Sequence, residues 1–454
     1  MNNLPFYVVP LTHHDWEEAV AYAKKLPAEA IPEVRLDMLS PDVDPEKFID
    51  SLKHRCIASC RRVSEGGYWP DEDETGRMER MQIALKGRPH WVDLEWEIDI
   101  PTWLEAELTH TRVLRSVHVA PGVFDIESRL ERLPRGDAYK WVGHASRLTD
   151  NLAIKKALAW AKDRYINVSA FLQGKKGVIS RCMQAAWGGS FTYAAPDNAE
   201  ESASGQIKLE TMLSWRCHRF YPAHGLCGVL GSPALQSEGP AFHNRRFQQS
   251  FKDLVYLPLE AETADEAFEA MKSLPLLGVS ITMPLKETLP SIMNLPSPIN
   301  TAWHRSEGEP WQWANTDSMA LEYFLTDIPA GPVLVLGGGG VAKTSTNVME
   351  KMGRPVINCT RRNPAPPSEV IEFAPVGVIQ ATSLGMNFVD PLPFPDILHA
   401  ARPSLRWAVE WVNCHETAFS TWAHESGLTL VRGQDLFEKQ ATLQSRIFIR
   451  ECGG

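Results

Sequence analysis

Residues 1–215 alternate between short apolar runs, which are typical of strands, and longer amphipathic runs, which are typical of helices. The strand-like runs number eight and read FYVVPLT, PEVRLDM, RCIASCRR, HWVDLEWE, TRVLRSVH, YKWVGHAS, INVSAFLQ and GSFTYAA. Helical spacing of apolar residues occurs between several of them, as in HDWEEAVAYAKKL, EKFIDSLKH and NLAIKKALAWAKDR. This repetition predicts a (β/α)8 barrel, an α/β fold whose active site lies at the carboxyl ends of the strands.

One strand-like run, YKWVGHAS, contains a lysine, Lys140, beside Trp141 and Val142. A buried ammonium is costly unless it is paired, and burial favours the neutral amine, which is a nucleophile. A lysine near a strand end also often keeps its head in water while its stem packs on apolar neighbours. The run by itself leaves both interpretations open.

A second run, PEVRLD, carries charged residues on one face. Glu33, Arg35 and Asp37 alternate with Val34 and Leu36, so the three charged side chains point to the same side of the strand. Such a face either turns into the active-site mouth of a barrel or forms a structural ion pair. The strand by itself fits both interpretations equally well.

Ionisable residues also follow two further strand-like runs. Arg61 and Glu65 come after the third run, in SCRRVSEGG, where two glycines permit a tight turn. His118 ends the run RSVH, a position suited to a general acid or base near neutral pH. A histidine bonded within the core is the commoner case for any single residue, but ionisable residues at several strand ends together favour a catalytic site.

Six segments in this half occur in a recognisable order: EVRLD, SCRRVSEGG, SVH, KWVGHASRLTDN, GKKGVISR and ESASGQ. They resemble the signature segments of the type I 3-dehydroquinate dehydratases, and the resemblance extends over residues 1–215. It implies that Lys140 forms an imine, or Schiff base, with the ketone of 3-dehydroquinate. It also implies that His118 moves protons and that Glu65 orients His118.

The same resemblance implies a set of substrate-binding residues. Arg181 would hold the substrate carboxylate as a bidentate fork, and Ser202 and Gln206 would act from a lid that closes on the substrate. The full implied set is Glu33, Arg35, Arg61, Arg181, Ser202 and Gln206. Gln173 stands where the family usually has methionine, and HVAPG lacks the family's usual residues after the histidine. Both departures concern substrate packing rather than imine chemistry.

Beyond about residue 220 the composition shifts to glycine, proline and small residues, which indicates a domain boundary. The clearest later signal is GPVLVLGGGGVAKTSTNVMEKM, an apolar strand, then Gly337, Gly339 and Gly340, then a helical run. Glycines in this context let a pyrophosphate approach a helix amino terminus.

About 20 residues further on, VINCTRRN has no acidic residue for a ribose 2′-hydroxyl. It offers Asn358, Thr360, Arg361 and Arg362 instead. Arginine at this position suits a 2′-phosphate, so the pattern favours NADP(H) over NAD(H). The alternative is that both arginines are part of a solvated turn, because exposed arginine is common.

Two segments, GVSITMPLKE and WANTDSM, precede the glycine-rich segment, and each is interpreted as a strand ending in an ionisable residue, Lys286 and Asp317. With SEGPAFHN, INTAW, ATSLGMN and DLFEKQA, they resemble segments of the shikimate dehydrogenases over residues 223–454. The resemblance implies that Lys286 and Asp317 pair beside the nicotinamide for proton transfer. It implies four substrate-binding residues: Ser237, Thr282, Asn300 and Gln440.

Two departures from the shikimate dehydrogenases concern substrate recognition. Gly239 replaces the second serine of the family's Ser-x-Ser carboxylate clamp, and EWVNCHET lacks the usual Tyr and Pro. Losing one hydrogen bond to a charged group costs about 1.5–3 kcal/mol, or roughly ten- to hundredfold in affinity. We therefore expect weaker shikimate binding without loss of hydride chemistry.

The two resemblances predict three domains. Residues 1–220 form the barrel, residues 221–318 form an α/β substrate domain completed by about 430–454, and residues 319–429 form a Rossmann-like NADP-binding domain. The predicted enzyme is bifunctional: it dehydrates 3-dehydroquinate to 3-dehydroshikimate through a lysine Schiff base, and reduces 3-dehydroshikimate to shikimate with NADPH.

Two alternative functions stay open. One is an active dehydratase with a drifted or quinate-preferring dehydrogenase half, which Gly239 favours. The other is a non-catalytic ligand sensor built from the same domains. A sensor needs no proton-transfer groups, so the presence of Lys140, His118, Lys286 and Asp317 argues against it.

Composition excludes other function classes. With 46 Lys and Arg against 56 Asp and Glu, the chain has no basic stripe that would neutralise nucleic-acid phosphates. No apolar run approaches the roughly 18–20 residues of a membrane span, and there is no signal-like amino terminus. The cysteines are scattered without metal-ligand spacing. We expect a cytoplasmic enzyme of small molecules, without a metal site; the sequence leaves its oligomeric state open.

Overall fold

A computed structural model describes residues 4–219, 225–306, 308–413 and 415–453. The chain divides into two compact units. One comprises Met1–Leu226, Pro233–Ala261 and Glu269–Pro275, and the other comprises Cys227–Ser232, Glu262–Phe268 and Leu276–Gly454. The predicted boundary after residue 220 lies outside the described residues.

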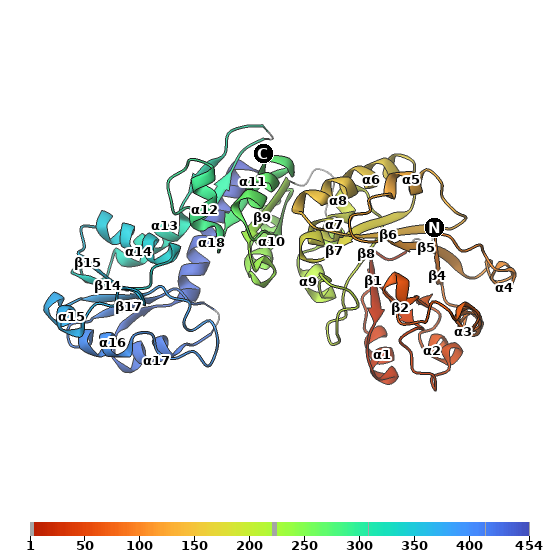
Figure 1. Cartoon of the computed structure of the whole chain (residues 1–454), viewed down its shortest axis with the longest axis horizontal. Helices are drawn as coiled ribbons and strands as arrows, with labels where there is room; N and C mark the ends of the chain where they lie inside the picture. Colours follow the sequence, from red (N-terminus) through yellow and green to blue (C-terminus); the bar gives the residue numbers. More distant parts are fainter. Residues whose placement is uncertain (1–3, 220–224, 307, 414, 454) are drawn as a thin grey trace. The chain divides into compact units, whose positions relative to one another are not determined.

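The amino-terminal half is a near-closed barrel of parallel strands, as predicted (Figure 1). All eight expected runs form strands, and the sheet order is β7-β6-β5-β4-β3-β2-β1-β8. The strands are β1 Tyr7–Leu11, β2 Ala30–Arg35, β3 Ile57–Ser59, β4 Trp91–Glu95, β5 Arg112–His118, β6 Ala138–His144, β7 Val168–Gln173 and β8 Thr192–Tyr193.

Helices follow the strands and cover the outside of the barrel. Helices were predicted at residues 14–26, 46–54 and 151–164, and the structure has α1, α2 and α6 at these places. The set is α1 Trp16–Ala23, α2 Pro45–Ser51, α3 Glu74–Lys86, α4 Thr102–Glu105, α5 Ile126–Leu130, α6 Asn151–Asp163, α7 Val178–Cys182, α8 Gln184–Trp187 and α9 Leu209–Ser214.

Strand alternation decides which side chains enter the barrel. Residues such as Ile31, Trp91 and Ala138 form an apolar cluster with Tyr193 inside the barrel, whereas Val34, Val92 and others pack outward with the helices. Side chains two residues further along a strand point to the same side as these inner residues. This parity places several polar side chains on the inner face, beyond the apolar cluster and towards the carboxyl ends: Glu33, Asp93, Ser116 and Lys140.

A second sheet has the order β10-β9-β11-β12-β13. Its last pairings, β11 with β12 and β12 with β13, are antiparallel. The strands are β9 Gly225–Gly231, β10 Leu254–Glu260, β11 Leu276–Ile281, β12 Thr301–Trp303 and β13 Gln312–Ala314. The helices of this region are α10 Gly239–Gln249, α11 Ala264–Ser273 and α12 Leu285–Ile292.

The third sheet is parallel, in the order β15-β14-β16-β17-β18, and helices cover both of its faces (Figure 1). Val333 and Val335 pack with α13 and α14, whereas Leu334 and Leu336 pack with α15, α16 and α17. Both faces of β14 are therefore apolar, which is typical of a doubly covered parallel strand. The elements are α13 Thr316–Leu325, β14 Val333–Leu336, α14 Gly340–Lys351, β15 Val356–Cys359, α15 Pro367–Phe373, β16 Gly377–Gln380, α16 Pro395–Ala401, β17 Trp407–Glu410, α17 Ala418–Glu425 and β18 Thr429–Val431.

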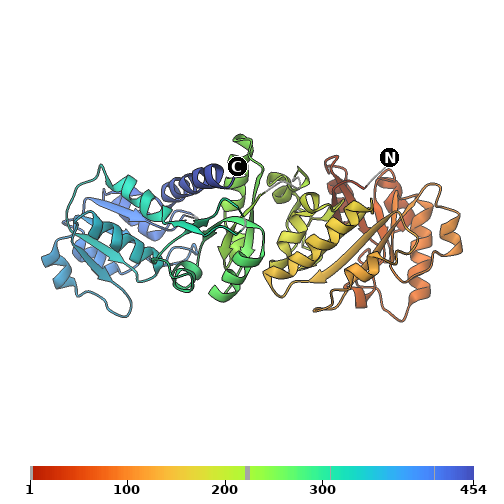
Figure 2. The same ribbon diagram turned by 90° about the horizontal axis from the view of Figure 1, so that it is seen from above.

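The last helix, α18 Gly433–Glu451, returns to elements that precede the third sheet (Figure 2). The amide of Gln444 donates to the carbonyl of Asn300 over 3.2 Å and to the hydroxyl of Thr301 over 2.9 Å. These bonds tie the end of the chain to strand β12.

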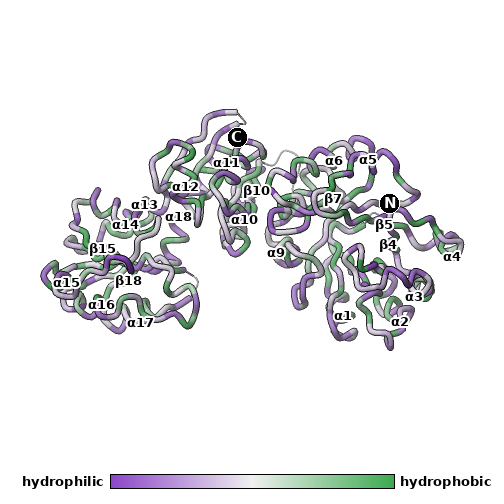
Figure 3. Tube along the Cα trace, in the orientation of Figure 1, coloured by the Kyte–Doolittle hydropathy of each residue, from purple (hydrophilic) through white to green (hydrophobic). Residues whose placement is uncertain are grey.

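Hydrophobic and hydrophilic residues alternate along the helices, as the coloured trace in Figure 3 shows. Among the described residues, none of the helices combines the length and the apolar character needed to cross a membrane.

Candidate active sites

Lys140 lies inside the barrel on β6, with a side chain that is only 1% exposed. Its Nζ donates to Oδ2 of Asp93 on β4 over 2.7 Å and to the hydroxyl of Tyr193 on β8 over 3.3 Å. Lys140 is therefore not a snorkelling surface residue. It is a buried amine held by two partners from strands on either side of the barrel.

The environment of Lys140 favours its neutral form. Burial lowers the pKa of the amine and the nearby Arg61 guanidinium acts in the same direction, while Asp93 and Glu33 raise it. The net effect is a pKa below the ordinary lysine value. A depressed pKa increases the fraction of nucleophilic amine near neutral pH.

His118 ends β5, and its Nδ1 lies 3.0 Å from Oε2 of Glu65. Glu65 ends the short turn Val63–Glu65, which Gly66 closes with a positive φ of 75°. Burial holds the pKa of His118 well below 6.5, with Arg61 and Lys140 adding to the effect. Burial also raises the pKa of Glu65 to about 7. The pair presents a neutral, oriented imidazole, the form needed by a general base.

Glu33 and Arg61 lie close to the Lys140–Asp93 pair. Nη2 of Arg61 is 3.4 Å from Oε1 of Glu33 and 3.7 Å from Oδ2 of Asp93. Oε2 of Glu33 is buried and has no hydrogen-bond partner among the described residues. Such an oxygen is costly unless a further donor, such as a substrate hydroxyl, reaches it.

Arg35 is already engaged in an ion pair. Its Nε and Nη2 donate to the two carboxylate oxygens of Asp37 over 2.9 and 2.6 Å, a bidentate arrangement. Of the two interpretations of the charged face, the structural ion pair accounts for Arg35 and Asp37, whereas Glu33 faces the buried lysine site.

Arg181 lies in α7 and is only 1% exposed, yet two of its nitrogens have no hydrogen-bond partner in the part of the chain that the structure describes. Its Nη1 donates to the carbonyl of Tyr193 over 3.3 Å, and Nε and Nη2 are buried without a hydrogen bond among the described residues. The guanidinium stacks over the ring of Phe171 at 4.3 Å, and burial lowers its pKa to about 10. An unpaired buried fork of this kind fits a carboxylate from a ligand.

Ser202 and Gln206 lie on the segment that follows β8. Oε1 of Gln206 accepts from the amide and the hydroxyl of Ser202 over 2.9 and 3.1 Å. Ser204 accepts through its carbonyl from the amide of Gly174, so the segment is anchored at the turn after β7. Both predicted residues therefore belong to one hydrogen-bonded turn.

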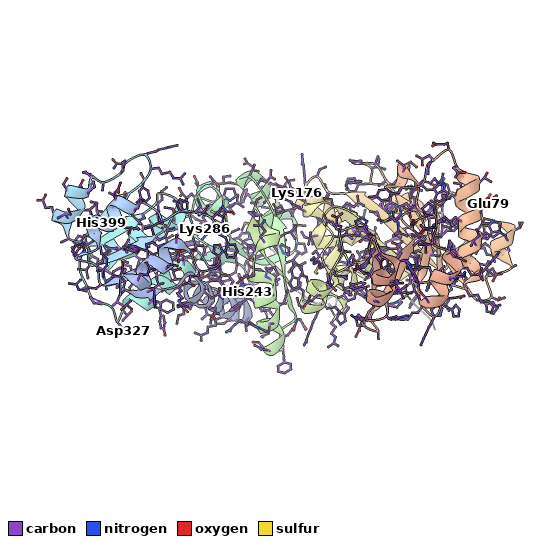
Figure 4. All side chains as sticks on the ribbon, turned by 90° about the horizontal axis from the view of Figure 1, so that it is seen from below. Glu79, Lys176, His243, Lys286, Asp327 and His399 are labelled. Carbon is purple, nitrogen blue, oxygen red and sulfur yellow. The ribbon has the colours of Figure 1, made fainter. Side chains whose placement is uncertain are left out.

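A second ionisable pair lies in the other half of the chain. Nζ of Lys286, labelled in Figure 4, donates to Oδ2 of Asp317 over 2.6 Å, and both side chains are largely buried. The prediction that these residues end strands is wrong. Lys286 lies in α12 and Asp317 in the first turn of α13, because Pro284 and Asn315 start helices directly after the strands.

Two of the predicted substrate-binding residues, Asn300 and Gln440, are fixed by local bonds close to Asp317. Asn300 accepts from the amide of Thr316 over 2.8 Å, and the hydroxyl of Thr316 donates to Gln440 over 3.3 Å. Thr282 follows β11 and is half-buried. The structure thus joins Asn300 and Gln440 through the residue before Asp317.

Ser237 lies before α10, and its hydroxyl accepts from the amide of Gly239 over 3.1 Å. A Cβ on Gly239 would lie 3.0 Å from that hydroxyl and 3.1 Å from Cε1 of Tyr256, with the Tyr256 hydroxyl 3.5 Å away. The space that a serine would use is therefore crowded. Position 239 has no side-chain hydroxyl, and the buried ring of Tyr256 lies beside the space that a serine side chain would occupy.

The glycine-rich segment has the geometry of a phosphate-binding turn. Gly337 has a φ of 125°, and a Cβ there would lie 2.5 Å from the carbonyl of Ala381. Gly339 starts α14 without a side-chain cap and faces open space, and Gly340 follows it. The first amides of α14 are therefore available to an anion, and the backbone can approach it closely. The segment fits a dinucleotide pyrophosphate.

The turn after β15 carries the predicted nucleotide-selecting residues. Asn358 accepts from the hydroxyl of Thr346 over 3.1 Å, and Thr360 closes a turn with Asn363. Arg361 and Arg362 are exposed and form no ion pair within the described ranges. Both guanidiniums are therefore exposed to solvent, where a phosphate can reach them.

Two family models match this chain, one in each half. Residues 7–216 match the family of type I 3-dehydroquinase, and residues 229–301 match the shikimate dehydrogenase substrate binding domain. The chain joins a type I 3-dehydroquinase to a shikimate dehydrogenase. It is therefore a bifunctional enzyme, a lyase and an oxidoreductase of the shikimate pathway, as the two resemblances predict.

The chain is also similar, at low identity, to solved structures of enzymes with these activities. The dehydroquinate dehydratase and shikimate dehydrogenase from S. pombe is 17% identical, with coverage of 100% of this chain and 97% of that chain and a TM-score of 0.41. Shikimate dehydrogenase from Aquifex aeolicus is 23% identical over 51% of this chain and 94% of its own, with a TM-score of 0.43. The 3-dehydroquinate dehydratase from Geobacillus kaustophilus is 20% identical over 46% and 89%, with a TM-score of 0.41.

Sequence reasoning did not select Asp93 and Tyr193 as residues of the dehydroquinase site. Asp93 interrupts the apolar run HWVDLEWE, and an acidic residue within a strand that is otherwise buried was an available signal. Tyr193 gave no such signal, because a tyrosine is ordinary in a strand. Tyr193 meets Lys140 because β8 and β6 belong to the same barrel, which the local sequence around Tyr193 does not reveal.

Proposed function

We propose that the dehydroquinase half works through an imine on Lys140. The observation that carries the proposal is the buried amine itself, held 2.7 Å from Asp93 and with a lowered pKa. Lys140 gives a proton to His118, and Nζ attacks the ketone carbon of 3-dehydroquinate. The carbonyl π pair moves to oxygen, which takes up the proton held by His118 and a second proton from Nζ. The oxygen then leaves as water, and the nitrogen lone pair forms the C=N bond of the protonated imine.

The imine then acidifies the adjacent C–H, which turns a difficult elimination into two easier steps. His118 removes that proton, the C–O bond to the leaving hydroxyl breaks, and the same proton goes to the hydroxyl as it departs as water. Hydrolysis of the imine releases 3-dehydroshikimate and restores Lys140. Glu65 holds the imidazole by the contact at 3.0 Å throughout.

We propose that Arg181 binds the substrate carboxylate. Its unpaired Nε and Nη2 supply two donors in the fork geometry that carboxylates prefer. Glu33 and Arg61 would bind hydroxyls near Lys140, and the turn of Ser202 and Gln206 would close over the ligand. Arg35 supports this site through its ion pair with Asp37.

In the dehydrogenase half, we propose that the Lys286 ammonium donates a proton to the carbonyl oxygen of 3-dehydroshikimate and that Asp317 holds the ammonium in place. NADPH, when bound, supplies the hydride. The amino terminus of α14 would hold its pyrophosphate, and Arg361 and Arg362 its 2′-phosphate. Ser237, Thr282, Asn300 and Gln440 would bind shikimate.

We further propose that these functions divide along the chain as residues 1–220, 221–318 with about 430–454, and 319–429. A coupled assay tests the whole proposal. With 3-dehydroquinate and NADPH, enone absorbance should rise first and NADPH should then be consumed.

Two variants separate the halves in that assay. Lys140→Ala should stop both signals from 3-dehydroquinate but consume NADPH when 3-dehydroshikimate is supplied. Lys286→Ala should let enone accumulate with little NADPH loss. No NADPH consumption by the parent enzyme, or consumption from 3-dehydroquinate by Lys140→Ala, would contradict the proposal.

A further inference from the structure

The hydroxyl of Tyr193 lies at the reacting nitrogen of the dehydratase. It accepts from Nζ of Lys140 over 3.3 Å and donates to Oε1 of Glu33 over 3.5 Å. The lysine nitrogen also lies 4.7 Å from the centre of the tyrosine ring. The hydroxyl therefore lies among the site's charged groups, whereas the ring belongs to the apolar cluster inside the barrel.

The position of the Tyr193 ring is fixed from several sides. The ring packs at tilted angles against Phe171 and Phe191, with centroids 5.8 and 6.4 Å away. Val8 of β1 is its partner in the strand register. A phenylalanine would fill the same apolar space, so packing does not require the hydroxyl.

We propose that Tyr193 is a further catalytic residue, whose hydroxyl donates a hydrogen bond to the oxygen of the carbinolamine on Lys140. This inference rests on the proposed imine mechanism. When Nζ bonds to the ketone carbon, the former carbonyl oxygen lies one bond beyond that carbon. A hydroxyl at 3.3 Å from Nζ is within reach of this oxygen.

The environment keeps the Tyr193 proton on its oxygen. Burial raises the pKa of the phenol well above its ordinary value, and the carboxylates of Glu33 and Asp93 raise it further. The phenol therefore stays neutral and acts as a donor throughout. Proton transfer remains with His118, so the step needs no additional proton source.

The hydroxyl would change partner during the reaction. In the free enzyme it donates to Glu33 at 3.5 Å, a long and weak hydrogen bond. As the ketone oxygen gains negative charge, it becomes a stronger acceptor than the distant carboxylate contact. Donors aimed at developing charge stabilise the transition state more than the ground state.

Tyr193→Phe tests the inference, because it removes only the hydroxyl and keeps the ring. In single-turnover experiments with 3-dehydroquinate and borohydride, the variant should form the reduced adduct on Lys140 roughly 100-fold more slowly, the lower end of the range for loss of one such donor. The fall should be in kcat, with little change in KM. Reduction of 3-dehydroshikimate by the same protein should be unchanged.

Tyr7→Phe is the matched control. Tyr7 is a buried tyrosine of the same barrel, but its hydroxyl bonds to the carbonyl of Met212 and lies 3.0 Å from His218. It should lose some thermal stability and form the adduct at the parental rate. An equal slowing in Tyr7→Phe would mean that hydroxyl loss acts through barrel stability, which would overturn the inference.

The outcomes distinguish the inference from the mechanism on which it rests. If the parent enzyme forms the adduct on Lys140 and Tyr193→Phe forms it equally fast, Tyr193 has no catalytic role and the imine mechanism stands. If the parent enzyme forms no adduct on Lys140, the imine mechanism itself is wrong.

Discussion

Nζ of Lys140 and Oδ2 of Asp93 lie 2.7 Å apart inside the barrel, each in the interior of a largely buried strand. The two side chains are 1% and 4% exposed, so neither charge is hydrated. Asp93 compensates the ammonium in the resting enzyme, while burial and Arg61 lower the cost of releasing a proton. The contact with Asp93 therefore holds the ammonium in the resting enzyme, whereas burial and Arg61 favour the nucleophilic amine.

Asp93→Asn should destabilise the barrel and shift the pH dependence of dehydration. Breaking a buried ion pair at one partner costs about 3–5 kcal/mol, which urea unfolding would measure. Asp93 raises the pKa of Lys140, so its loss should move the kinetic limb for amine deprotonation to lower pH. Glu97→Gln, at an exposed pair with Arg129, is the control and should cost under about 1 kcal/mol. Equal stability of the two variants would contradict the prediction.

His118 should keep dehydration active under mildly acidic conditions. Its pKa lies well below the ordinary 6.5 because the imidazole is buried near Arg61 and Lys140. Since the neutral form accepts the proton, kcat/KM should stay high until pH falls below 6.5 and then decline. His118→Ala should slow dehydration at least about a hundredfold. The parent enzyme could instead show a midpoint above pH 6.5 in its profile of kcat/KM, and His118→Ala could lack that midpoint. This result would show that the pKa of the imidazole is not lowered in the way the structure indicates.

Arg181→Met should weaken substrate binding without weakening the fold. The loss of two charge-assisted hydrogen bonds should raise KM for 3-dehydroquinate roughly a hundredfold. Because Nε and Nη2 of Arg181 are buried and unpaired, an apolar side chain of similar volume should leave Tm equal or higher. Arg77→Met is the contrast, since Arg77 pairs with Glu74 and Glu95 and its loss should lower Tm. A large fall in Tm for Arg181→Met would indicate a structural role.

Arg361→Ala combined with Arg362→Ala should remove a preference for NADPH. Loss of charged contacts to a 2′-phosphate should raise KM for NADPH roughly 10- to 100-fold, less at high salt, and leave KM for NADH unchanged. Arg406→Ala, at an exposed arginine before β17, should alter neither value. A parent enzyme that uses NADH as well as NADPH would show that the turn is merely solvated.

The barrel fold follows from local sequence patterns, whereas the roles of the dehydroquinase residues came from the resemblance to the family. Short apolar runs predicted every barrel strand, and alternation within PEVRLD and the apolar neighbours of Lys140 marked two charged positions that needed an explanation. Asp93 and Tyr193 were missed as partners because they meet Lys140 from 47 and 53 residues away. Barrel closure, rather than either local segment, brings them together.

The dehydrogenase half shows a different limit. Sequence similarity paired Lys286 with Asp317, and the structure has their side chains 2.6 Å apart. Their secondary structure was misjudged, because an apolar strand followed closely by a helix start reads as one continuous run. Asn315 caps α13 through the amide of Ser318, which a capping signal in NTDS could have indicated.

The most direct test of the imine mechanism is peptide mass spectrometry after borohydride treatment of the enzyme with 3-dehydroquinate. The mechanism predicts a reduced adduct on the peptide that contains Lys140, at one equivalent per chain, and none in Lys140→Ala, which should also lose dehydration. Lys175 and Lys176 follow the next strand and serve as internal controls that should stay unmodified. An adduct on another lysine, or dehydration that survives Lys140→Ala, would contradict it.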